Sequence, residues 1–180
     1  YNATGDFKGG LAYLEGYRSQ FTESDEIASW KAYFLGQIGE HNQAIGLYHE
    51  LFMAGYRSDD DLRDYLKLLK AAGNLTLAGE VLDHYLQEQM VLEFALERAE
   101  VFSAAEQYSE GLAYVKQLEQ SRPFDADLAV KIIEFEVALS QFDDAIVHSN
   151  VLIQKRVYPA YSYYLRGQAQ FQLNSFEEAK

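Results

Sequence analysis

Apolar side chains recur at steps of three and four residues along almost the whole chain, as in the row Leu62, Leu66 and Leu69. This spacing places apolar residues on one face of an α-helix, whereas a half-buried strand would need strict alternation. Only two prolines, Pro123 and Pro159, interrupt the pattern. The pattern therefore predicts an all-α protein made of amphipathic helices.

A longer period runs through these helices. Small residues recur 34, 34, 33, 34 and 34 positions apart, at Gly10, Ala44, Ala78, Gly111, Ala145 and Ala179. Three positions before each of them stands Phe7, His41, Leu75, Tyr108, Phe142 or Phe176. Two further series keep the same spacing: Tyr17, Leu51, Tyr85, Leu118 and Leu152, and Ala32, Leu66, Ala99, Ile133 and Gly167. A fixed period of this length indicates a repeat protein in which each unit stacks on the next.

The period resembles that of the tetratricopeptide repeat (TPR) family, in which each repeat is a pair of antiparallel helices. Segments 39–45, 141–146 and 174–179 look like the start of that family's second helix. The resemblance implies an all-α, right-handed superhelical α-α solenoid of TPR-like helix-turn-helix repeats. It also implies that a small residue lies where the two helices of a repeat cross.

The turn between the two helices of a repeat needs a residue that tolerates a positive φ. Such residues stand in register at Gly5, Gly39, Gly73 and Asn174, whereas Glu106 and Ser140 depart from the pattern. Of the prolines that end repeats in the family, only Pro123 is present. The repeats are therefore divergent ones.

In this register, residues 1–24 hold the second helix of a truncated repeat, and residues 160–180 hold the first helix of another. Four complete TPR-like repeats lie between them, at residues 25–58, 59–91, 92–125 and 126–159. Stable arrays normally close with polar capping helices. We therefore expect the chain to be a piece of a longer array, or its ends to pair with something.

The resemblance also implies a partner-binding groove, lined by the second, fifth, sixth, ninth, twelfth and thirteenth residues of each first helix. The residues singled out on this face are Trp30, Tyr33, Gln37, Arg63, Lys67, Lys70, Glu93, Glu97, Glu100, Lys131, Glu134, Tyr164 and Gln168. Arg63, Lys67 and Lys70 share one helical face, so they either receive an acidic peptide or pair with Glu97 and Glu100. Trp30 and Tyr33 form either a binding hot spot or part of the core.

The charge of the chain narrows the choice of partner. With 15 basic and 28 acidic residues, the formal net charge is -13, which disfavours nucleic acid and anionic membrane surfaces.

Cysteine is absent, which excludes disulfides and thiolate sites, and no apolar run is long enough to insert into a membrane. None of the four histidines forms a metal-binding pair, and His41 falls at a packing position of the repeat. We therefore expect no metal, no cofactor and no catalytic residue.

These observations favour a protein-protein interaction scaffold, not an enzyme, which binds a peptide or protein segment in its groove. The alternative is a structural stretch of a longer superhelical assembly subunit that associates through its ends. Tyrosines of segment 158–164 either pack between adjacent repeats or form an edge that favours self-association. Divergent arrays of this kind occur often in bacterial envelope and secretion systems, and this analogy favours a soluble periplasmic or envelope-associated location.

Overall fold

The structure is a computed structural model that describes residues 5–18, 24–122 and 124–178. Every regular element within these residues is an α-helix, as the apolar spacing predicts. The helices are α1 (Phe7–Arg18), α2 (Asp25–Gln37), α3 (His41–Met53), α4 (Asp59–Ala71), α5 (Leu75–Glu88), α6 (Leu92–Ala104), α7 (Tyr108–Ser121), α8 (Ala126–Ala138), α9 (Phe142–Gln154) and α10 (Pro159–Glu178). Pro123, Ala179 and the side chains of Tyr17 and Phe176 lie outside the described part of the chain.

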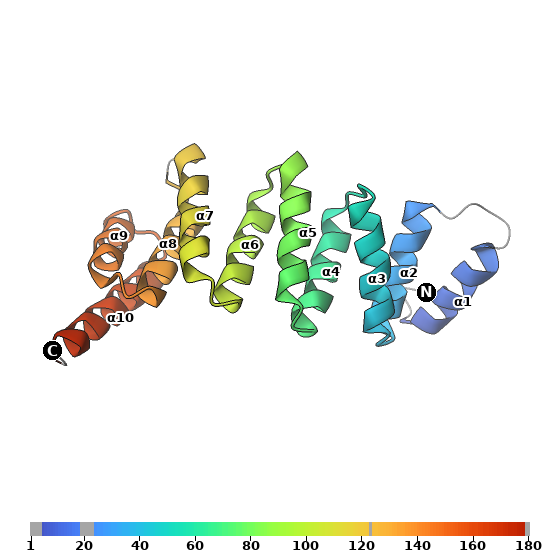
Figure 1. The fold of residues 1–180 in the computed structure, drawn as a ribbon, viewed down its shortest axis with the longest axis horizontal. Coiled ribbons are helices and arrows are strands. Elements are labelled where there is room, and N and C mark those ends of the chain that lie inside the picture. The colour runs from blue at the N-terminus through green and yellow to red at the C-terminus, as the bar shows by residue number, and fades with distance from the viewer. Residues whose placement is uncertain (1–4, 19–23, 123, 179–180) are drawn as a thin grey trace. The chain divides into compact units, whose positions relative to one another are not determined.

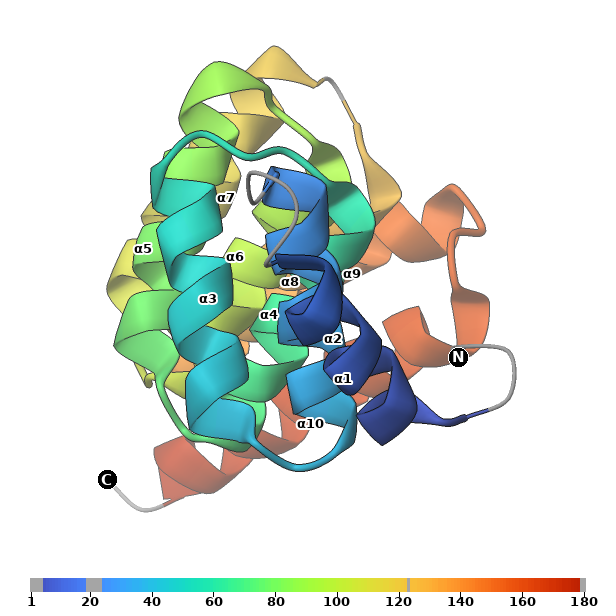
Figure 2. The same cartoon turned by 90° about the vertical axis from the view of Figure 1, so that its right-hand side faces the viewer.

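The helices form two compact units, unit 1 (Tyr1–Val91) and unit 2 (Leu92–Lys180), each considered by itself. In unit 1 each helix packs against the next along the chain, and alternate helices also touch, α2 with α4 and α3 with α5. First helices α2 and α4 therefore form one layer and second helices α3 and α5 the other (Figures 1 and 2). Unit 2 follows the same rule, because α8 touches both α6 and α10. Each unit is thus an all-α repeat solenoid.

The turns inside the repeats share one backbone conformation whatever residue occupies them. Gly39 and Gly73 have φ values of 90° and 69°, and Glu106 and Ser140, at 57° and 59°, also lie in the left-handed region. The residue after each turn donates its N–H to a carbonyl five positions earlier, for example Gln141 to Glu136 at 2.8 Å. These hydrogen bonds hold Glu106 and Ser140 in a left-handed conformation that costs about 1–2 kcal/mol for a residue with a Cβ.

The turn predicted at Asn174 is wrong, because α10 continues as a helix from Pro159 to Glu178. At the other turns a second helix follows and packs back on the first, and its burial compensates for ending the first helix. Asparagine is tolerated inside a helix, so propagation, which adds one hydrogen bond per residue, prevails here.

The small residues of the repeat are buried where helices cross. Ala44, Ala78 and Ala145 have no exposed surface, and Gly111 is buried as well. A Cβ at Gly111 would lie 2.5 Å from Cζ of Phe135 on α8 and 3.1 Å from Cβ of Phe102 on α6. Phe135 is itself buried in a core cluster with Ile132 and Val115, so its ring has little room to move. The absence of a side chain at position 111 therefore lets α7 lie close to both first helices.

The aromatic series that precedes the small residues is less uniform. Phe142 is buried and Tyr108 is half-buried, but His41 is exposed at the first residue of α3. The expected packing position of His41 is thus wrong. An imidazole at a helix start keeps its hydration, whereas a phenyl ring gains by burial.

A charged cluster lies in the core of unit 2. Glu136 of α8 has no exposed surface, and its two carboxylate oxygens face two second helices. Nδ1 of His148 on α9 lies 2.7 Å from Oε2, and Nζ of Lys116 on α7 lies 3.1 Å from Oε1. The hydrogen bond to Glu136 raises the pKa of His148, although burial and Lys116 oppose it. Because an unpaired buried carboxylate is costly, these contacts stabilise the packing of α8 between α7 and α9.

Replacing Gly111 by alanine should destabilise unit 2 by about 1–3 kcal/mol, because the new methyl group would overlap the Phe135 ring. Gly167→Ala is the matched control, since a Cβ at this position of α10 meets nothing within 4 Å. The control should gain about 0.5–1 kcal/mol, as is usual for alanine in a helix. Urea unfolding of both variants measures the difference, and equal stability would contradict the close approach of α7.

Unfolding measured at several pH values tests the His148–Glu136 contact. The pKa of His148 is raised in the folded state, so its stabilisation is complete below about pH 6.5 and is lost as the pH rises through the folded pKa. His148→Gln keeps a hydrogen-bond donor but cannot titrate. The melting temperature of the wild-type protein should therefore exceed that of the variant by a margin that shrinks from pH 6 to pH 8. A constant margin would mean that Glu136 does not favour the protonated imidazole.

Candidate partner-binding surface

A hollow of about 370 Å³, here named the α2–α4 hollow, lies between two first helices of unit 1. Its lining consists of Glu26, Ser29, Trp30, Tyr33, Tyr56, Ser58, Asp60, Asp61 and Asp64. The residues from α2 are its second, fifth, sixth and ninth, and Asp60 and Asp64 are the second and sixth of α4. These are the helix positions that the repeat register assigns to a groove.

Trp30 is the largest apolar side chain of this hollow, and it is 42% exposed. Its ring meets Tyr33 edge-on, with centroids 5.9 Å apart and an angle of 89° between the planes. It also lies 5.7 Å from the ring of Phe34, which is buried in the core of unit 1. Trp30 therefore packs on the core through Phe34, while a large part of its indole remains exposed to solvent.

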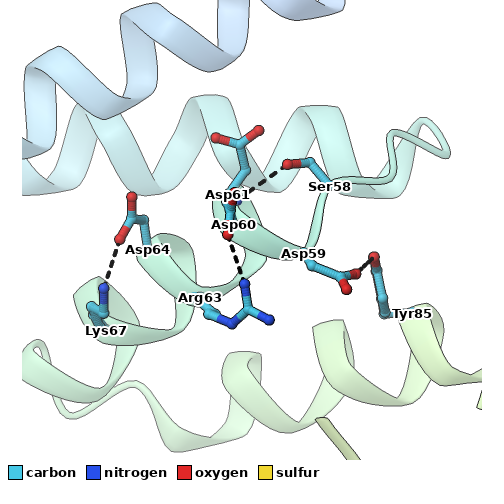
Figure 3. Close-up of polar contacts among 8 residues, drawn as sticks. All are labelled: Ser58, Asp59, Asp60, Asp61, Arg63, Asp64, Lys67 and Tyr85. Atoms are coloured by element: carbon cyan, nitrogen blue, oxygen red, sulfur yellow. Dashed lines mark hydrogen bonds and ion pairs between the residues drawn. The ribbon is translucent and has the colours of Figure 1, made fainter. Parts of the chain in front are cut away.

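Carboxylates dominate the polar groups of the α2–α4 hollow. Figure 3 shows the carboxylates of Asp61 and Asp64 pointing to the same side of α4. The hydroxyl of Tyr56 donates to Oδ2 of Asp61 at 2.8 Å, and the hydroxyl of Ser58 caps α4 by accepting from the Asp61 N–H at 3.3 Å. A tyrosine hydroxyl orients a carboxylate without removing its charge. The hollow is consequently negative.

The predicted cations of α4 lie beside these carboxylates. Arg63 bonds to Asp60 at 2.7 Å and Lys67 bonds to Asp64 at 2.8 Å, each three residues earlier on the same helix (Figure 3). The side chains of Asp60 and Lys67 are 95% and 72% exposed, so both pairs add little to stability. Two of the three predicted cations of α4 are thus paired with carboxylates of the same helix.

The first residue of α4 is attached to α5. The hydroxyl of Tyr85 donates to Oδ1 of Asp59 at 2.6 Å. Burial, followed by this hydrogen bond, raises the pKa of Tyr85 to about 12, so the phenol stays protonated and remains a donor. The contact fixes the start of α4 on its second-helix layer.

A second hollow, named the α6–α8 hollow, has a volume of about 440 Å³ and lies within unit 2. Its lining consists of Glu93, Leu96, Glu97, Glu100, Asp127, Val130, Lys131, Tyr158 and Tyr161. The α6 residues are again the second, fifth, sixth and ninth of their helix, and those from α8 are its second, fifth and sixth. The same register therefore builds a hollow in each unit.

Lys131 is the basic residue of the α6–α8 hollow, and its side chain is 17% exposed. It pairs with Glu100 of α6 and, at 2.7 Å, with Glu134 of α8. Burial lowers the pKa of Lys131, but its hydrogen bonds to the two glutamates outweigh burial and raise it. The ammonium group is therefore charged and held between two carboxylates.

Two tyrosines complete this hollow, Tyr161 of α10 and Tyr158, which directly precedes that helix. Tyr161 donates to Oε1 of Glu134 at 2.6 Å, and this hydrogen bond is the main cause that raises the pKa of Tyr161 to about 12. Tyr158 donates to Asp127 at 2.9 Å. Both tyrosines stay protonated at neutral pH and hold the start of α10 against α8.

The structure places the predicted residues in separate groups. Trp30 and Tyr33 meet in the α2–α4 hollow, and Glu93, Glu97, Glu100 and Lys131 meet in the α6–α8 hollow. Gln37 and Lys67 line a smaller hollow of about 90 Å³ next to Tyr33. Lys70 is exposed on α4, and Tyr164 and Gln168 are exposed on α10.

Several lining residues were not singled out from the sequence. Glu26, Ser29, Asp60, Asp64, Leu96, Asp127 and Val130 stand at the same helix positions as the chosen residues, so the register itself was the signal that identifies them. Tyr56, Ser58, Asp61 and Tyr158 lie outside those positions. Only the three-dimensional arrangement reveals this second group.

The hollows offer carboxylate charge, hydrogen-bond acceptors and aromatic surface. Within the described residues, no group of three or more histidine, aspartate and glutamate side chains is arranged to hold a metal ion. No described helix is both long enough and apolar enough to cross a bilayer.

Comparison with known proteins finds similarity in structure alone. No family model matches the sequence, and no curated protein matches it. A tetratricopeptide repeat protein from Parabacteroides merdae aligns with a TM-score of 0.57 and 19% identity, over 99% of this chain and 70% of its own. The TPR protein TTC0263 from Thermus thermophilus aligns at 0.56 and 15% identity, over 94% and 93% of the two chains. A mutant of MamA aligns at 0.60 and 15% identity, over 86% of each chain.

At these identities the likeness concerns the fold. It agrees with the period of the small residues, with the paired helices of each unit and with the shared turn conformation. The fold of this chain is an array of TPR-like helix-turn-helix repeats.

Proposed function

We propose that this chain is a protein-binding scaffold that holds a peptide or protein segment against the first helices of its repeats. The observation that carries the proposal is the position of Trp30, which is 42% exposed inside a hollow and fixed by Tyr33 and Phe34. Aromatic anchors that are rigid before binding lose little conformational entropy when a partner arrives. Hydrogen-bonding groups around the indole then orient the bound segment.

The size of the hollow fits a polypeptide. Along α2 the lining runs from Glu26 to Tyr33, which spans about 10 Å at 1.5 Å per helical residue. An extended chain advances about 3.3 Å per residue, so roughly three residues of a partner lie along this stretch. The α6–α8 hollow uses the same helix positions and has a similar volume. Each unit therefore offers one short binding stretch.

Selection from a random peptide library displayed on phage tests this proposal with the full chain as bait. The affinity of the strongest peptide for Trp30→Ala should fall by about tenfold or more, because a central aromatic anchor typically contributes about 2 kcal/mol. Trp30→Phe should recover part of the loss, and fluorescence anisotropy gives each Kd.

Met53→Ala is the matched control, since Met53 is 41% exposed but lies on second helix α3. Its affinity should equal that of the wild-type chain, and thermal melts verify that all variants are folded. Selected peptides that bind Trp30→Ala as well as wild type would contradict the assignment of the α2–α4 hollow.

A second candidate function is self-association as part of a larger assembly, and the surface of α10 favours it. Tyr164 and Phe171 are 60% and 70% exposed, and they stand two helical turns apart on one side of the helix. The ring of Tyr164 stacks on Tyr161 at 5.8 Å. Exposed aromatic rows of this kind commonly mark protein contacts.

Analytical ultracentrifugation over a hundredfold range of concentration tests self-association. If α10 mediates it, the wild-type chain should form dimers or larger species as concentration rises, and Tyr164→Ser with Phe171→Ser should remain monomeric. Val147→Ser, at a 59% exposed position of α9, serves as control. A wild-type chain that stays monomeric throughout argues against this function.

A further inference from the structure

Both hollows carry the same sign of charge. Four carboxylates line the α2–α4 hollow, from Glu26, Asp60, Asp61 and Asp64. Four more line the α6–α8 hollow, from Glu93, Glu97, Glu100 and Asp127. Among the described lining residues of the two hollows, Lys131 alone is basic. The same chemistry therefore recurs at equivalent helix positions of two separate units.

Neighbouring groups offset only part of this charge. In the α2–α4 hollow, Arg63 and Lys67 pair with Asp60 and Asp64, but Asp61 is bonded to the neutral hydroxyl of Tyr56. In the α6–α8 hollow, Asp127 is likewise bonded to the neutral hydroxyl of Tyr158. Lys131 is shared between Glu100 and Glu134. The α2–α4 hollow thus keeps more carboxylates than cations, in a chain whose net charge is already -13.

We infer that the segment bound in the α2–α4 hollow is basic, and that its lysine or arginine side chains meet the carboxylates while one of them lies over Trp30. This inference rests on the proposed scaffold function and specifies the chemistry of its partner. Charge complementarity carries it: opposite charges speed association and orient the partner, whereas an acidic segment would face like charge in this hollow. Carboxylates also accept the charge-assisted, often bidentate hydrogen bonds that arginine donates.

The aromatic lining suits the same partner. A guanidinium or ammonium group is attracted to the face of an indole, and tryptophan is the strongest of the aromatic side chains in this contact. The chain contains the contact elsewhere: Arg57 lies 5.0 Å from the ring centre of Tyr85, and Lys155 lies 4.0 Å from that of Phe124.

Two synthetic peptides test the charge of the partner with the full chain. One is a short fluorescein-labelled peptide that alternates arginine, leucine and glycine, and the other has glutamate in place of every arginine. Anisotropy should show binding of the arginine peptide that weakens steeply as salt is added, because the contacts are between exposed charges. The glutamate peptide should not bind. Equal or tighter binding of the glutamate peptide would overturn the inference.

A charge-neutralised variant locates the binding. Glu26→Gln, Asp60→Asn and Asp64→Asn together should weaken the arginine peptide by at least about tenfold, since several charge-assisted contacts are removed at once. The control is Glu80→Gln, Glu110→Gln and Asp143→Asn, which removes the same three charges from exposed positions of second helices α5, α7 and α9. Both variants lose two carboxylates from first helical turns and one from a helix interior, and melting curves verify their folding. An equal loss in the two variants would show attraction by net charge only and would overturn the inference.

The experiments distinguish failure of the basic-partner inference from failure of the scaffold proposal. If library peptides bind in a Trp30-dependent way but prove acidic or uncharged, the scaffold function stands and the basic partner is wrong. If no peptide depends on Trp30, the α2–α4 hollow fails as a binding site and both proposals fail with it.

Discussion

The close approach of the two helices within each repeat determines the rest of the structure. Ala44, Ala78, Gly111 and Ala145 are buried at successive crossings, and a methyl group at Gly111 would lie 3.1 Å from Cβ of Phe102 in the same repeat and overlap the Phe135 ring of the next. A crossing this tight permits one packing of the pair. Pairs built in the same way stack with the same helix layer on the same side, so equivalent positions of α2 and α4, or of α6 and α8, meet at a hollow. The surface chemistry of those positions is then free to vary.

Most of the fold follows from the periodicity of the sequence, because helices and their buried stripes depend on neighbours a few residues away. Leu62, Leu66 and Leu69 are buried along α4, as their spacing predicts. Local information fails where two local states are nearly equal in free energy. Asn174 tolerates both turn and helix, and it lies inside α10. At Glu106 and Ser140, by contrast, the turn persists without glycine, because the hydrogen bonds that close it come from the backbone.

The candidate surface is less accessible from the sequence. Helix position identifies which residues face a groove, and it finds Trp30 and Glu97 as readily as it would find Asp60. It does not reveal that Arg63 and Lys67 bond to aspartates of their own helix. Because of these ion pairs, the two cations lie within a surface that carries more carboxylates than basic groups. Nor does helix position locate Tyr56 or Tyr158, which come from connecting segments and orient carboxylates of first helices. Such contacts join distant parts of the chain, and they arise only when the helices are packed.

Each hollow is complete within its own unit. The lining of the α2–α4 hollow comes entirely from unit 1, and that of the α6–α8 hollow comes entirely from unit 2. Under the proposed scaffold function the chain therefore offers two binding stretches, and neither hollow needs the other to take shape. A partner with two suitable segments gains avidity, because binding of the first segment raises the effective concentration of the second. For such a protein the length of the spacer between segments becomes a determinant of selectivity, alongside the residues that touch each hollow.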